Sequence, residues 1–188
     1  MTMRNTAILF AVVLLAACQS ATTAPAPEPQ ASAPPPNPAP WSNPPLNASE
    51  VPRVYMQQWM RAENRRGCAL IAPMLLGEEG KGAAPRAATF AGGWAVSYDT
   101  DDVRSAFGVA GTGTSLKDGG EIYDDWPVKR EWDDGSRAGY GPEGGTGPNE
   151  LAYVRVAGQD CLYNVWSRLG RDHLESLIEN LRFVRTDR

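Results

Sequence analysis

Carboxylate side chains are concentrated between residues 99 and 134. This stretch holds ten acidic and four basic residues, a net charge of −6. Residues 99–102 and 133–136 have the oxygen-rich composition of calcium-binding turns, but neither matches the EF-hand loop. Asp before Gly is also common in ordinary turns. We therefore predict no metal site, and keep as an alternative a glycan hydrolase that uses two of these acids across a cleft.

Aromatic side chains lie among these acids and continue into a glycine-rich stretch. Trp126, Trp132 and Tyr140 accompany Arg137 within residues 121–147. Exposed Trp and Tyr rings supply large contact areas at low entropic cost, and an Arg guanidinium stacks on rings or pairs with carboxylates. The sequence predicts a binding surface made of these four side chains, for a sugar or a protein partner. The alternative is that the rings fill the core.

Nucleophilic and phosphate-binding motifs are absent from the sequence. His173 is the only histidine, and its charged neighbours favour a solvated first turn of a helix. No serine stands in a G-x-S-x-G elbow. The glycine-rich residues 108–115 match neither a Walker loop nor a dinucleotide fingerprint. We predict no catalytic residue and no cofactor.

The N-terminus has the layout of a secretory signal. One positive charge, Arg4, precedes the apolar residues 7–17. This run is too short for a helix that spans a bilayer, which needs about 20 residues. The last three residues of this run and the next residue, Leu15-Ala16-Ala17-Cys18, resemble the lipobox of bacterial lipoproteins.

The resemblance covers residues 1–18 and carries specific implications. Signal peptide 1–17 would be removed, and Cys18 would carry fatty acyl chains, such as palmitate, as a membrane anchor. In that family an Asp after the Cys retains the protein in the inner membrane, whereas this chain has Gln19. The resemblance therefore implies a lipid-anchored protein of the outer membrane, facing the periplasm or the cell exterior.

The segment after the anchor is rich in proline and alanine. Residues 19–50 contain ten prolines and no glycine. Proline lacks a backbone N–H and fixes φ, so such a segment favours an extended polyproline conformation. We therefore predict a tether over residues 18–50 and one globular domain over residues 51–188.

Two cysteines remain for the domain, Cys68 and Cys161. Exported proteins occupy an oxidising compartment, where two cysteines tend to pair. The sequence favours a disulfide between them, with two free thiols as the alternative. A metal site is disfavoured because two sulfurs and one histidine do not supply four ligands.

Apolar spacing predicts helices at both ends of the domain and strands between them. Helical spacing opens it at Val51, Tyr55, Trp59 and Ala62, and Leu174–Leu181 marks a second amphipathic helix. Strands are predicted over residues 69–74, 89–98, 105–110 and 128–132, with loops over 76–88 and 135–149. Residues 151–157 and 161–167 predict a hairpin in which Leu162, Asn164 and Trp166 share one face. The fold class is α+β, an antiparallel sheet with both helices packed on it.

The overall charge excludes one class of partner. A net charge of −4 and a pI near 5.1 argue against a nucleic-acid binder, which needs a basic excess. We predict a non-catalytic binding or envelope-organising domain, held at the membrane by its lipid anchor. Its expected partner is an envelope protein or a glycan.

Overall fold

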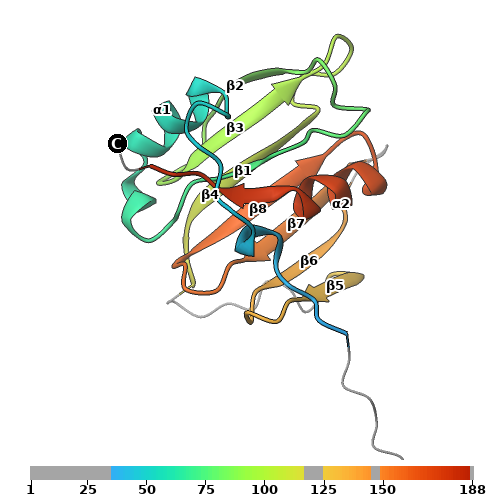
Figure 1. Ribbon diagram of the computed structural model, residues 1–188. Coiled ribbons are helices and arrows are strands. Elements are labelled where there is room, and N and C mark those ends of the chain that lie inside the picture. The colour runs from blue at the N-terminus through green and yellow to red at the C-terminus, as the bar shows by residue number, and fades with distance from the viewer. Residues whose placement is uncertain (1–34, 117–124, 145–148, 187–188) are drawn as a thin grey trace, which may run out of the picture. The chain divides into compact units, whose positions relative to one another are not determined.

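A computed structural model describes residues 35–116, 125–144 and 149–186 (Figure 1). Pro35–Arg188 forms one compact unit. The signal peptide, Cys18 and the first part of the predicted tether lie outside the described residues.

One antiparallel sheet dominates the compact unit, in agreement with the antiparallel sheet of the predicted α+β class. Its seven strands run in the order β2-β3-β4-β8-β7-β6-β5. Their bounds are Ala84–Ala88 (β2), Trp94–Asp99 (β3), Phe107–Ser115 (β4), Val128–Glu131 (β5), Arg137–Pro142 (β6), Glu150–Arg155 (β7) and Cys161–Ser167 (β8). A separate antiparallel pair joins β1 (Ile71–Pro73) to β9 (Leu181–Phe183).

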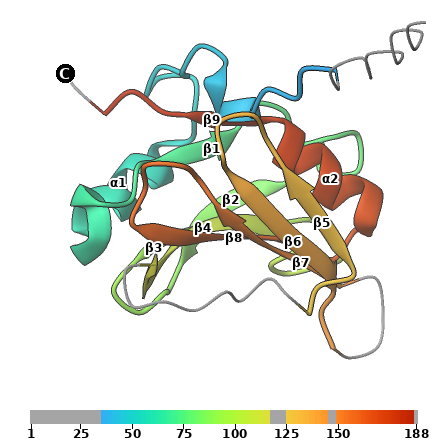
Figure 2. The same ribbon diagram turned by 90° about the horizontal axis from the view of Figure 1, so that it is seen from below.

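Two α-helices accompany the sheet within the part of the chain that the structure describes. Helix α1 (Arg53–Arg61) contacts β2 and β3, whereas α2 (Arg171–Glu179) contacts β7 and β8. Figure 2 shows both helices on the same side as the β1–β9 pair. Short 3-10 helices cover Pro40–Ser42 (η1) and Glu63–Arg66 (η2).

The main core lies between the helices and one face of the sheet. Alternate residues of each strand point to this face because side chains alternate along a strand. The largest fully buried side chains include Trp94 and Phe107 from the sheet and Tyr55 and Leu174 from the helices. The hairpin of β7 and β8 follows the predicted alternation, since Tyr163 and Val165 lie in this core.

Two predicted loops contain strands. Within residues 135–149, Arg137–Pro142 forms β6, and within residues 76–88, Ala84–Ala88 forms β2. Gly141 makes room for its neighbours, because a Cβ there would collide with Pro127 and lie 3.3 Å from the Trp126 ring. Glycine has low strand propensity, so the glycine-rich sequence of β6 does not predict a strand, and tertiary packing stabilises it.

The folded unit also includes residues that the sequence assigned to the tether. We call residues 37–46 the docked segment. Trp41 is 4% exposed, and its ring centroid lies 4.9 Å from that of Trp132. The Leu46 N–H donates to the Phe183 carbonyl, and the Arg185 N–H donates to the Leu46 carbonyl. The predicted boundary at residue 51 therefore lies inside the compact unit, because these contacts join distant parts of the sequence.

A disulfide joins Cys68 to Cys161, as predicted. Their Cα atoms lie 5.3 Å apart, and 93 positions separate them in sequence. Cys68 follows η2, and Cys161 is the first residue of β8. The bond therefore ties the start of the domain to a central strand of the sheet.

Candidate binding site

The acids at positions 133 and 134 hold the docked segment. Asp133 Oδ2 accepts a hydrogen bond of 2.8 Å from the Asn37 backbone N–H. Asp134 Oδ2 accepts one of 3.0 Å from the Trp41 indole N–H. The two carboxylates that resembled a calcium-binding turn thus contact groups about 90 residues earlier in the chain.

The surroundings of Asp134 stabilise its charged form. Partial burial acts to raise the pKa of this carboxyl group. Hydrogen bonds from the Ser136 backbone N–H and the Trp41 indole act in the opposite direction, and the net result is a lowered pKa. Asp134 is therefore ionised at neutral pH and suited to holding Trp41.

The remaining acids of residues 99–134 have varied surroundings. Asp99 receives hydrogen bonds from the Ser105 N–H and from Arg86 Nε, which hold its pKa below the usual value. Asp118, Glu121 and Asp124 lie outside the described residues. Among the residues that the structure describes, no cluster of three His, Cys, Asp or Glu side chains could hold a metal ion.

The four side chains of the predicted binding surface divide between two faces of the sheet. Trp132 is 6% exposed and Tyr140 is 1% exposed, so these two rings belong to the core and do not form an exposed platform. Trp41 covers Trp132, and the Tyr140 hydroxyl donates to Glu175 of α2 over 2.9 Å. The prediction of exposure is wrong for both rings, because Trp41, which the sequence assigned to a free tether, packs on Trp132, and Tyr140 packs next to Glu175 of α2.

The other two predicted residues, Trp126 and Arg137, lie away from that core. Arg137 is exposed, and its Nε lies 3.4 Å from a carboxylate oxygen of Glu131. Trp126 is half-buried and packs edge-on against Tyr153 of β7, with ring centroids 5.5 Å apart. Tyr153 lies on the face of the sheet that the helices leave uncovered, so its contact with Trp126 places Trp126 at this face as well.

We call this side of the seven-stranded sheet the open face. No helix or strand packs on it within residues 35–116, 125–144 and 149–186. Its side chains occupy the positions that alternate with core residues. They include Ala95, Ala110, Thr112, Tyr153, Leu162, Asn164 and Trp166.

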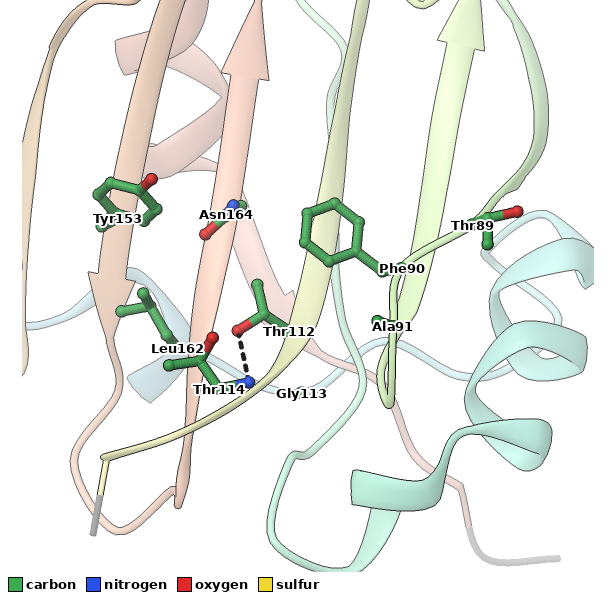
Figure 3. A pocket seen from close by; sticks show the side chains of 9 residues that line it. All are labelled: Thr89, Phe90, Ala91, Thr112, Gly113, Thr114, Tyr153, Leu162 and Asn164. Atoms are coloured by element: carbon green, nitrogen blue, oxygen red, sulfur yellow. Dashed lines mark hydrogen bonds between the residues drawn. The ribbon is translucent and has the colours of Figure 1, made fainter. Parts of the chain in front are cut away.

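A hollow of about 580 Å³ lies on the open face (Figure 3). Its walls come from Phe90 and Ala91 in the β2–β3 turn and from residues 112–114 of β4. Strands β7 and β8 contribute Tyr153, Leu162 and Asn164. This volume falls within the range typical of small-molecule sites, about 300–1,000 Å³.

Glycines hold the β2–β3 turn against β4. A Cβ on Gly93 would collide with the Gly111 carbonyl oxygen, and a Cβ on Gly113 would collide with the Ala91 carbonyl oxygen. Only glycine allows two backbones to approach so closely. This contact places Phe90 at the rim of the hollow, where the residue is 37% exposed.

Asn164 supplies a polar atom without a partner. Its side-chain oxygen is buried and accepts no hydrogen bond from the described residues. Figure 3 shows this side chain between Tyr153 and Phe90. An unpaired buried acceptor costs about 1–3 kcal/mol, so such a group in a hollow indicates a place for a donor from a ligand.

Sequence reasoning missed Phe90, Tyr153 and Asn164 as candidate site residues. One signal pointed to Asn164: the alternation of residues 161–167 placed this residue between Leu162 and Trp166 on a single face. A polar side chain at the centre of an otherwise apolar strand face is a candidate ligand contact. Phe90 gave no comparable signal, because its position at the rim depends on the contact between the backbones of Gly113 and Ala91, which are far apart in sequence.

The single histidine lies in the core, so the prediction of a solvated first turn is wrong. His173 is 2% exposed. Its Nε2–H donates to the Leu76 carbonyl oxygen over 2.9 Å, because that oxygen can only accept. Nδ1 therefore accepts from the Ser167 hydroxyl, also over 2.9 Å. His173 thus attaches the chain after β1 to α2 and β8.

This environment makes stability depend on pH. Burial lowers the pKa of His173, although the Leu76 hydrogen bond and the Glu79 charge act to raise it. The unfolded chain then binds a proton at His173 more readily than the folded chain does, so the free energy of unfolding should fall as pH decreases through about 6.5.

Urea unfolding at pH 7.5, 6.5 and 5.5 measures this pH dependence of stability. His173→Gln retains a donor and cannot titrate in this range, so it should flatten the dependence. An unchanged slope in this variant would assign the dependence to another group.

No protein-family model, curated protein or solved structure matches this chain. Within the described residues, neither helix combines the length and the apolar character that crossing a membrane requires.

Proposed function

We propose that this chain is an exported, lipid-anchored bacterial protein whose domain binds an envelope component in the open-face hollow. The lipobox-like residues Leu15-Ala16-Ala17-Cys18 support the anchor. The unpaired buried oxygen of Asn164, in a hollow rimmed by Phe90 and Tyr153, is the observation that carries the binding role.

The anchor has its own test. Cys18→Ser removes the acylated sulfur, so the protein should lose its lipid and no longer fractionate with the outer membrane. Metabolic labelling with a fatty acid, followed by membrane fractionation, measures both effects. Gln19→Asn serves as a matched control that leaves Cys18 in place. Recovery of lipidated Cys18→Ser protein from the outer membrane would contradict the proposed anchor.

The binding role is tested by photo-crosslinking in intact cells. Benzoylphenylalanine in place of Phe90 keeps an aromatic ring at the rim and reacts with C–H bonds of whatever occupies the hollow. The same group in place of Met60, which is 56% exposed on α1, is the matched control. We expect a covalent adduct at position 90 alone.

A second variant makes this test specific to the hollow. Asn164→Leu, combined with the crosslinker at position 90, removes the acceptor and leaves the rim unchanged, so the adduct should decrease at least severalfold. The proposal fails if position 90 gives no adduct, if position 60 gives the same adduct, or if Asn164→Leu leaves its amount unchanged.

A further inference from the structure

We propose that the open-face hollow takes a neutral oligosaccharide that carries N-acetyl groups. This inference rests on the proposed binding function and names the chemical class of its ligand. The hollow favours a neutral ligand, because no described residue that lines it is charged. A phosphate or carboxylate ligand would lose its hydration there without gaining a cation.

The walls combine ring surfaces with polar atoms. Phe90 and Tyr153 offer aromatic groups, while Thr112, Thr114 and Asn164 offer hydroxyl and amide groups. A purely apolar ligand would leave Asn164 Oδ1 unpaired, at a cost. A sugar ring has both an apolar C–H face that stacks on an aromatic ring and a polar edge, so it satisfies both kinds of surface.

The N-acetyl group follows from two neighbours in β8. Asn164 Oδ1 needs an N–H or O–H donor, and Leu162 borders the same hollow. An acetamido group provides an N–H donor and a methyl group a few bonds away. It can therefore pair with the Asn164 oxygen and place its methyl group against Leu162.

The extent of the hollow favours more than one sugar ring. A second hollow of about 210 Å³ shares residues 112–114 with the first and is also lined by Cys161. Unlike the first hollow, the second has charged residues in its lining, namely Glu63, Arg66 and Asp160, so the absence of charge that favours a neutral ligand is a property of the first hollow alone. Residues 112–114 line both hollows, so a ligand longer than one ring that binds in the first hollow can extend over these residues toward the second.

The test is a calorimetric titration of the full chain in detergent with the trimer of N-acetylglucosamine. The matching trimer of glucosamine lacks the acetyl groups and is cationic. We expect the acetylated trimer to bind at least tenfold more tightly than the glucosamine trimer. Asn164→Leu and Tyr153→Ala should each weaken its binding by about tenfold or more, because each removes one of the paired surfaces.

Two variants control for structure. Tyr153→Phe keeps the ring and should bind within about threefold of the unchanged chain, and Met60→Ala on α1 should not differ from it. Thermal unfolding of each variant verifies that the domain is folded. Equal affinity for the two trimers, or binding that Asn164→Leu and Tyr153→Ala leave unchanged, would overturn the inference.

The outcomes also separate the ligand class from the proposed function. If neither trimer binds but position 90 still crosslinks in intact cells, the hollow binds another chemical class and the proposed function stands. If neither trimer binds and position 90 gives no adduct, both proposals fail.

Discussion

Replacing Trp41 by alanine is expected to lower the free energy of unfolding by about 3–5 kcal/mol, the usual cost of removing a large buried aromatic side chain. Trp41 is 4% exposed, and its ring centroid lies 4.9 Å from that of Trp132. Its indole N–H donates a hydrogen bond to the Asp134 carboxylate. Its loss opens a cavity and leaves the Asp134 carboxylate without one donor. Urea unfolding of the full chain at pH 7.5 measures the change.

Two variants make this prediction specific. Trp41→Phe keeps a ring against Trp132 but removes the indole N–H, so it should cost less than Trp41→Ala. Pro45→Ala changes an exposed residue of the docked segment and should stay within about 0.5 kcal/mol of the unchanged chain. If Trp41→Ala unfolds at the same urea concentration as the unchanged chain, residues 37–46 belong to a free tether, as the sequence alone suggested.

Removal of the disulfide has the second large expected effect. In the chain-entropy model a crosslink across 93 positions adds up to about 4.5 kcal/mol of stability, because it restricts the unfolded chain. The double variant with Cys68→Ala and Cys161→Ala should therefore unfold at a clearly lower urea concentration than the oxidised chain.

Reduction supplies the control for this experiment. Dithiothreitol should lower the stability of the unchanged chain and have no effect on the double alanine variant, which has no bond to reduce. Identical urea midpoints for the oxidised chain and the double variant would contradict the stabilising role of the Cys68–Cys161 bond.

The sequence predicted those elements whose alternation or helical spacing of apolar residues is regular. The hairpin of β7 and β8 alternates cleanly, and α2 has regular apolar spacing, so both could be identified from the sequence. The disulfide followed from the expected compartment. Strand β6 was missed because Gly139, Gly141 and Pro142 lower its strand propensity, and its pairing with β7 supplies the stabilisation.

The four side chains that the sequence predicted as a binding surface are not among the residues that line the hollow, because the position of the hollow depends on long-range contacts. Trp126 contacts Tyr153, which lines the hollow. Trp132 is buried because Trp41 packs on its ring. A proline-rich segment gave no indication that it would pack back on the domain. Phe90 joins the site because glycine backbones meet between the β2–β3 turn and β4.

We propose that the unpaired oxygen of Asn164 marks a ligand site on the open face. Nuclear magnetic resonance of the Asn164 side-chain amide tests it most directly, with the signal assigned through its absence in Asn164→Leu. The probe is solubilised cell envelope from the expressing bacterium, added to labelled full chain. We predict that the Asn164 amide and Phe90 ring signals shift together, while the Met60 methyl signal on α1 stays in place. Unchanged Asn164 and Phe90 signals at saturating envelope, or an equal shift at Met60, would contradict the claim.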